Sequence, residues 1–241
     1  MDATATSTVP VTDKPPRRRR SIPLSARMFV ALLALLGVSG GLWVGPPAYR
    51  QHVAIREVEQ LGGQIKTRSR GPSSLRNLVG ANRMKVFDEV VDVDLSTKPA
   101  TDATLSRLGR LHGIKWLRLD HTRVTDARLA HLKGMTGLQQ LYLNDTQVTD
   151  AGLEHLMGLA NLQSLWIANT KVTDSGLANL KGLNSLKSLV LGRTKVTDAG
   201  LVHLKGLTSL QTLALNNTQV TRTGVVDLKR SMLPQRLRVY R

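Results

Sequence analysis

Cysteine is absent from this chain of 241 residues, and aromatic residues make up only 3% of it. The lack of cysteine excludes a disulfide framework, thiolate zinc sites and thiol nucleophiles, and it leaves the redox compartment open. Because aromatic side chains are scarce, we expect a core built from aliphatic residues. Acidic residues are also few, since 17 Asp and Glu stand against 34 Lys and Arg and leave a formal net charge of +17.

The N-terminal part contains one long segment without charge. Residues 1–27 are rich in Thr, Pro and Arg, show no apolar period and include four consecutive arginines at 17–20, which predicts a disordered basic tail. Residues 28–48 follow without a charged side chain. As a helix they would cover about 31 Å, enough for the hydrocarbon core of one bilayer. We therefore predict a transmembrane signal-anchor helix over 28–48.

Two other interpretations of 28–48 are a cleaved signal peptide and a buried soluble helix. The segment has no A-x-A cleavage site and no polar face, and both absences favour the anchor. More Lys and Arg residues precede the segment than follow it at similar distance, so the positive-inside rule predicts a cytoplasmic N-terminus. The expected location is then the cell membrane, crossed once, with the rest of the chain on the periplasmic or extracellular side.

Residues 49–92 have mixed character and are expected to form a juxtamembrane helix and the N-terminal cap of the following domain. Apolar residues at helical spacing over 53–61 end at Gly62 and Gly63, which are typical of a helix terminus. The pattern then predicts a short strand over 64–67, a short helix over 75–79 and a strand over 87–93.

Residues 93–241 repeat with a period of 24. The residues that open each expected strand are Val93, Leu117, Leu141, Leu165, Leu189, Leu213 and Leu237, and a second aliphatic residue follows two positions later in each. This alternation places the aliphatic residues inward and the residue between them on the opposite face of a parallel sheet. Because one coil cannot bury its apolar side alone, stacked coils would share one aliphatic core. The sequence therefore predicts an α/β solenoid.

Within a coil, residue spacings that recur from repeat to repeat predict the remaining elements. A threonine five positions after the strand-opening residue, as in Thr122 and Thr146, can bond to backbone groups in the turn that leaves the strand. The tripeptide Val-Thr-Asp, as in 124–126, predicts a helix start, because Thr is a good N-cap and Asp complements the positive helix end. Glycines such as Gly134 are expected to stop these helices.

The pattern L-x-x-L-x-L-x-x-T-x-V at 138–148, followed by V-T-D-x-G-L, resembles the leucine-rich-repeat signature with Thr where Asn or Cys is usual. It is similar to the cysteine-containing subfamily of F-box proteins, and closer to membrane-anchored bacterial leucine-rich-repeat proteins with 24-residue units. The resemblance covers about 93–241; it implies a curved solenoid that binds proteins or other ligands on a concave sheet, and no catalytic residues. Lys98, Ala100 and Arg222 depart from the pattern, which is typical of terminal capping coils.

Candidate catalytic or metal sites are not evident in the sequence. His131, His155 and His203 recur at one position, so a metal pair is conceivable, but no acidic or third ligand recurs beside them and duplication explains them better. The aspartates at 126, 150, 174 and 198 are explained by helix initiation. There is no phosphate-binding glycine loop and no nucleophile-base pair. We expect a protein without enzymatic activity, cofactor or metal.

The expected binding site lies on the outward strand positions, where the solenoid carries side chains that its core does not need. Interface hot spots are commonly composed of aromatic residues and arginine surrounded by hydrogen-bonding groups. The candidates are Arg118, Tyr142, Trp166, Asp120, Asn144, Asn169 and Arg193. A competing interpretation is that Tyr142 and Trp166 stack on each other and only cover the sheet.

The sequence thus predicts a membrane-anchored interaction module for a protein or other macromolecular ligand. An F-box-like adaptor and a polyanion-binding protein are the alternatives; nucleic acid is not expected, because the basic run has no interleaved aromatic residues. A ligand site at the basic C-terminal end, near Arg236, Arg238 and Arg241, is the fallback if the sheet face fails.

Overall fold

The computed structural model describes residues 50–69, 77, 88–233 and 236–241. The predicted basic tail, the predicted anchor over 28–48 and nearly all of the predicted helix over 75–79 lie outside these residues. Within the described ranges, no helix is both long and apolar enough to span a bilayer.

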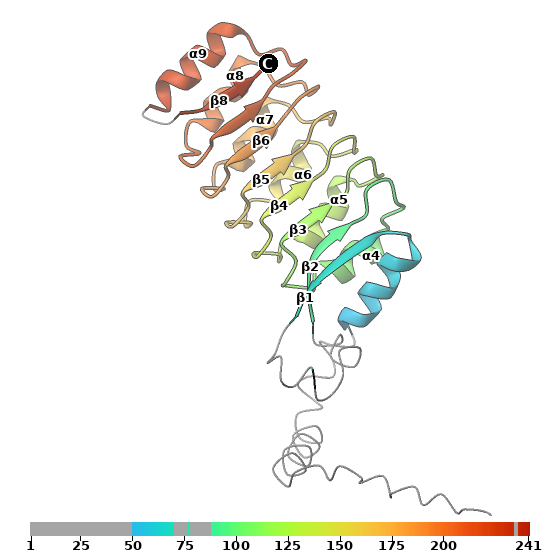
Figure 1. Ribbon diagram of the computed structural model, residues 1–241. Helices are drawn as coiled ribbons and strands as arrows, with labels where there is room; N and C mark the ends of the chain where they lie inside the picture. Colours follow the sequence, from blue (N-terminus) through green and yellow to red (C-terminus); the bar gives the residue numbers. More distant parts are fainter. Residues whose placement is uncertain (1–49, 70–76, 78–87, 234–235) are drawn as a thin grey trace, which may run out of the picture. The chain divides into compact units, whose positions relative to one another are not determined.

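The described chain winds as a solenoid, each coil adding one short strand to a single sheet (Figure 1). Strand order follows chain order, and every pairing from β2 to β8 is parallel. The strands are β1 (Gln64–Arg68), β2 (Glu89–Asp94), β3 (Trp116–Arg118), β4 (Gln140–Tyr142), β5 (Ser164–Trp166), β6 (Ser188–Val190), β7 (Thr212–Ala214) and β8 (Arg238–Tyr240). The predicted parallel solenoid is confirmed.

A row of short helices accompanies the sheet, one in each coil, and neighbouring helices contact each other along the solenoid (Figure 1). The helices are α4 (Asp102–Leu108), α5 (Asp126–Leu129), α6 (Asp150–Glu154), α7 (Asp174–Leu177), α8 (Asp198–Leu201) and α9 (Arg222–Ser231). The 3-10 turns η2 (Ala130–Leu132), η3 (Ala178–Leu180) and η4 (Val202–Leu204) extend α5, α7 and α8. The side of the molecule formed by these elements is called the helical face below, and the opposite side the sheet face.

The core between the two faces is aliphatic, as expected from the composition. The inward strand residues, such as Leu141 and Leu143, are fully buried, as are the helical leucines Leu153 and Leu156. No aromatic residue is among the buried hydrophobic residues of the described chain. Each coil packs its apolar side against the next coil, so the core is one continuous cluster from Ala54 to Leu237.

The cap at the start of the solenoid combines a helix over residues 50–60 with β1, which pairs antiparallel with β2. Ala54 and Val58 of the helix are buried in the shared core. Gly62 ends the helix in the left-handed region at φ 74°. A side chain at Gly63 would come within 2.8 Å of the Asp94 carbonyl, so only glycine allows the helix to pack this closely.

The threonines that leave the strands donate their hydroxyl hydrogens to backbone carbonyls, and all of them are buried except Thr218, which is half-buried. Thr122 Oγ1 donates to the Leu119 carbonyl at 2.6 Å, and Thr146 Oγ1 to that of Leu143 at the same distance. Thr170, Thr194 and Thr218 repeat this bond. The predicted role of these threonines in the turn is confirmed.

The predicted position of the last strand is wrong by two residues, because Val239 and not Leu237 takes the strand-opening position of the last coil. Leu213 pairs with Val239 and not with Leu237, so 26 residues separate these partners where 24 separate Leu189 and Leu213. The two additional residues follow from α9, which is ten residues long and replaces the four-residue helix and 3-10 turn of the preceding coil. Leu237 still enters the core and is 6% exposed.

The glycines expected to stop the helices lie in the turns after the helical segments, but they do not act through a left-handed residue. Among the glycines of the described chain, only Gly62 has a positive φ. The helical segments end instead in right-handed residues, such as Lys133 at φ −52° after η2.

Candidate functional site

The predicted binding residues begin with a row across the centre of the sheet face. Sheet register aligns Arg118 with Tyr142, and Tyr142 with Trp166, on three successive strands. The Arg118 guanidinium carbon lies 5.4 Å from the centroid of the Tyr142 ring, and the rings of Tyr142 and Trp166 are 5.2 Å apart at 45°. Trp166 is 37% exposed. This aromatic row combines a cation–π contact with a tilted ring pair, and its far end is open to solvent.

Arg118 is held from the other side by a carboxylate that sequence reasoning missed. Asp92, whose side chain is 4% exposed, accepts from Arg118 Nη1 at 2.9 Å and pairs with Lys66 Nζ at 3.2 Å. Trp116, which was also missed, lies next to Asp92 in register and is half-buried. Trp116 lies two residues before Arg118, on the same face of the sheet, and Asp92 occupies the register position of Trp116 one coil earlier. Including the outward position two residues before Arg118, and its partner in the preceding coil, would have found both residues.

Asp120 and Asn144 are two further candidates, and their side-chain oxygens accept hydrogen bonds from the next coil. The Asn144 N–H donates to Asp120 Oδ1 at 2.9 Å, and the Ala168 N–H donates to Asn144 Oδ1 at 2.8 Å. Burial raises the pKa of Asp120 above its ordinary value, and the two hydrogen bonds from Asn144 oppose that shift only in part. These two residues therefore connect coils, which leaves less of their bonding capacity for a ligand.

Asn169 and Arg193 lie in a column of left-handed residues. His121, Asp145, Asn169, Arg193 and Asn217 all have φ between 52° and 57°. The strain has a structural cause in the first four of these residues, since the N–H of each donates to a carbonyl of the next coil, as from Arg193 to Asn216 at 2.8 Å. Within the column the Asn169 amide donates to the Asp145 carboxylate, and His121 Nδ1 lies 3.5 Å from Asp145 Oδ2.

An open hollow of about 400 Å³ brings part of the predicted set together. Trp166, Asn144, Asn169 and Arg193 line it, together with small residues such as Gly192. Arg118, Tyr142 and Asp120 are not among its lining residues. The hollow thus lies beside the exposed end of the aromatic row, where large side chains give way to Val190, Gly192 and Ala168.

On the helical face, one contact between an aspartate and a threonine repeats from coil to coil. The Asp126 carboxylate accepts from the Thr149 N–H at 2.8 Å and from Thr149 Oγ1 at 2.6 Å, one coil further on. The pairs Asp150–Thr173, Asp174–Thr197 and Asp198–Thr221 repeat this geometry. We call these four pairs the Asp–Thr clamps; the sequence suggested only helix initiation for the aspartates.

The clamps also explain the glycine of the D-x-G-L pattern. A side chain at Gly176 would lie 2.3 Å from Asp150 Oδ1, and one at Gly200 the same distance from Asp174 Oδ1. A β-carbon cannot occupy that space. The glycine therefore admits the carboxylate of the preceding coil.

The recurring histidines show no sign of a shared ligand. His131 Nε2 lies 3.2 Å from Asp102 Oδ1, on the helical face. Within the residues that the structure describes, no group of three or more His, Asp or Glu side chains is placed to hold a metal ion.

Comparisons with known proteins bear on the fold. No family model and no curated protein matches the sequence. Among solved structures, internalin C2 of Listeria monocytogenes is 24% identical with a TM-score of 0.50, over 62% of this chain and 70% of that one. The chain has the leucine-rich-repeat fold.

Two other solved structures are similar to smaller extents. A leucine-rich-repeat protein of Leptospira interrogans is 22% identical with a TM-score of 0.45, over 56% of this chain and 33% of that one. Another internalin of Listeria monocytogenes is 23% identical with a TM-score of 0.36, over 56% of this chain and 50% of that one.

Proposed function

We propose that this leucine-rich-repeat chain is a binding module that takes a protein ligand on its sheet face, at the exposed end of the aromatic row. The observation that carries the proposal is the position of Trp166, which forms a tilted ring pair with Tyr142, is partly exposed and lies beside the 400 Å³ hollow. Aromatic anchors beside a small depression with a polar rim are typical of interface hot spots.

The rigidity of the row favours binding. Arg118 is fixed by Asp92 on one side and Tyr142 on the other, and Tyr142 Oη donates to Gln140 Oε1 at 2.7 Å. Side chains already held in one rotamer lose less conformational freedom when a partner docks. The rim residues Asn169 and Arg193 add donors next to an apolar centre.

A site-specific crosslinking experiment tests the location. A photoreactive phenylalanine analogue replaces Val190, which lines the hollow, and in a matched protein it replaces Lys181 on the helical face. We expect a discrete crosslinked protein from the Val190 position and none from Lys181. Equal products from both positions, or products from Lys181 alone, would contradict a sheet-face site.

The membrane assignment is the second part of the proposal. The uncharged segment 28–48 and the excess of basic residues before it support a single-pass anchor with a cytoplasmic N-terminus and repeats on the other side. We expect protease added to spheroplasts to digest the repeats and to spare an N-terminal tag. Digestion of the tag alone would reverse the orientation, and a soluble form that lacks residues 1–45 would indicate a cleaved signal peptide instead.

A further inference from the structure

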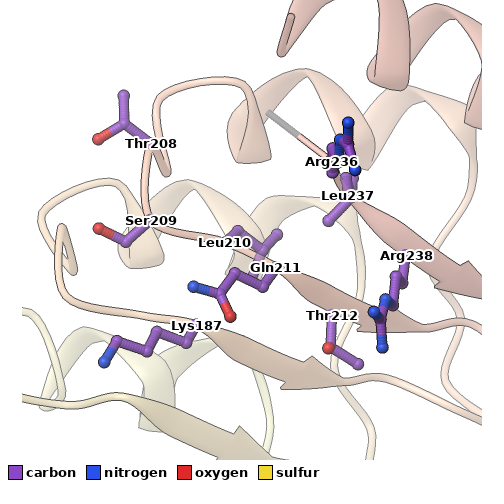
Figure 2. A pocket seen from close by; sticks show the side chains of 9 residues that line it. All are labelled: Lys187, Thr208, Ser209, Leu210, Gln211, Thr212, Arg236, Leu237 and Arg238. Carbon is purple, nitrogen blue, oxygen red and sulfur yellow. The ribbon is translucent and has the colours of Figure 1, made fainter. Parts of the chain in front are cut away.

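A second hollow, larger than the one beside Trp166, lies where the last regular coil meets β8 (Figure 2). Its volume is about 720 Å³, which is within the range of small-molecule sites. It is lined by Lys187, Thr208, Ser209, Leu210, Gln211, Thr212, Arg236, Leu237 and Arg238. None of these residues belongs to the aromatic row.

The hollow lies where the hydrogen bonding between coils changes. In the regular coils two successive N–H groups donate to one carbonyl of the coil before, as Gln211 and Thr212 do to Lys187 at 2.8 and 2.9 Å. In the last coil, among the described residues, only the Arg238 N–H donates in this way, to the Gln211 carbonyl at 2.8 Å. The last coil, which is two residues longer, thus makes one such bond fewer beside the hollow.

The charges around this space have one sign. Lys187, Arg236 and Arg238 are exposed, and none of the lining residues is Asp or Glu. In Figure 2, Lys187 lies on one side of the hollow and the two arginines lie on the other. Hydroxyl groups of Thr208, Ser209 and Thr212 and the Gln211 amide supply further donors, above the buried Leu210 and Leu237.

We infer that this hollow is a binding site for an anion that carries two or more phosphate groups. Arginine offers a planar pair of donors that matches a phosphate, and lysine adds a compact positive charge. Because the cations stand on opposite sides of a space much larger than one phosphate ion, a ligand with separated charges fits better than inorganic phosphate. Residues 49–241 hold 28 Lys and Arg against 15 Asp and Glu, and this excess of positive charge attracts such a ligand from a distance.

Calorimetric titration of the full chain with tripolyphosphate tests the inference. We expect saturable binding of one ligand per chain, and the double variant Arg236→Gln with Arg238→Gln weakens it by at least about tenfold. The matched control, Lys133→Gln with Lys181→Gln, removes the same charge from the helical face and changes Kd less than about twofold. Equal losses in both variants, or no saturation, would overturn the site, because the attraction would then be only that of the net charge.

Further probes identify the ligand chemistry and its source. Inorganic phosphate should bind at least about tenfold more weakly than tripolyphosphate, and citrate that binds as tightly as tripolyphosphate would overturn the preference for phosphate. Linear polyphosphate that competes with tripolyphosphate and keeps the dependence on Arg236 and Arg238 would indicate a polymeric source, whereas binding of the short form alone would indicate a free small molecule. Trp166→Ala leaves all these affinities unchanged, which separates this site from the proposed protein site.

Discussion

The two faces of this solenoid differ in how much their residues change from coil to coil: the helical face repeats the same side chains, and the sheet face varies them. On the helical face the same pair of residues recurs in the four Asp–Thr clamps, each with bond lengths between 2.5 and 2.8 Å. On the sheet face the corresponding column changes from Arg118 to Tyr142, Trp166, Val190 and Ala214. The recurring pairs join neighbouring coils, whereas the varying column gives each coil of the sheet face a different side chain.

The largest effect is expected in the core that both faces share. Leu143→Asp or Leu191→Asp places an unpaired carboxylate at a position with 0% exposure and should cost several kcal/mol, so the neighbouring coils unfold with the altered one. Thermal and chemical unfolding of each variant measures this loss. An unchanged Tm would contradict the repeat register on which the comparison rests.

Breaking one clamp should destabilise the helical face to a smaller extent. Asp174→Ala removes two charge-assisted hydrogen bonds from Thr197, so we expect a loss of about 2 kcal/mol in the free energy of unfolding. Asp227→Ala is the control, because this exposed carboxylate pairs with Arg230 at a distance of 4.0 Å within the same helix and does not join two coils in the described chain. Equal stability of the two variants in urea titrations would show that the clamps do not join the coils.

Changes to the aromatic row should affect binding and leave the fold intact. Trp166→Ala and Tyr142→Ala should each weaken the binding of a captured partner by about 2 kcal/mol, since residues at the centre of an interface carry most of its affinity. Lys133→Ala and Lys181→Ala on the helical face should change the affinity little. Surface plasmon resonance on the purified partner compares the four proteins, and similar losses on both faces would remove the distinction between them.

The smallest effect concerns Asp120, whose pKa is raised by burial in the sheet-face ladder. A carboxyl with a raised folded-state pKa opposes folding when ionised, so its cost is absent below the unfolded value and grows as pH rises through the folded pKa. Asp120→Asn retains an acceptor for the Asn144 N–H, as Asn144 itself serves Ala168. The variant should match the parent near pH 3 and be slightly more stable at pH 7. Lower stability at pH 7 would show that the negative charge supports the ladder.

Much of the fold followed from the sequence because the determining pattern is local. Alternation in Leu141 and Leu143 predicted which residues enter the core, the spacing of Thr146 predicted the turn, and Val-Thr-Asp predicted where each helix begins. The same register placed Arg118, Tyr142 and Trp166 side by side. Each of these features depends on the position of a residue within its own coil, which a repeat displays directly.

The remaining features depend on what one coil presents to the next, and only the tertiary structure decided them. The period shows that Asp150 and Asp174 share an environment, but not that each carboxylate reaches the threonine of the following coil and requires a glycine beside it. The same holds for Asp92 against Arg118 and for the shift that pairs Leu213 with Val239. The sequence already offers Arg236 and Arg238 as a fallback site, but the hollow that they line together with Lys187 depends on how the longer last coil packs against the preceding one, and helix length and packing set that distance.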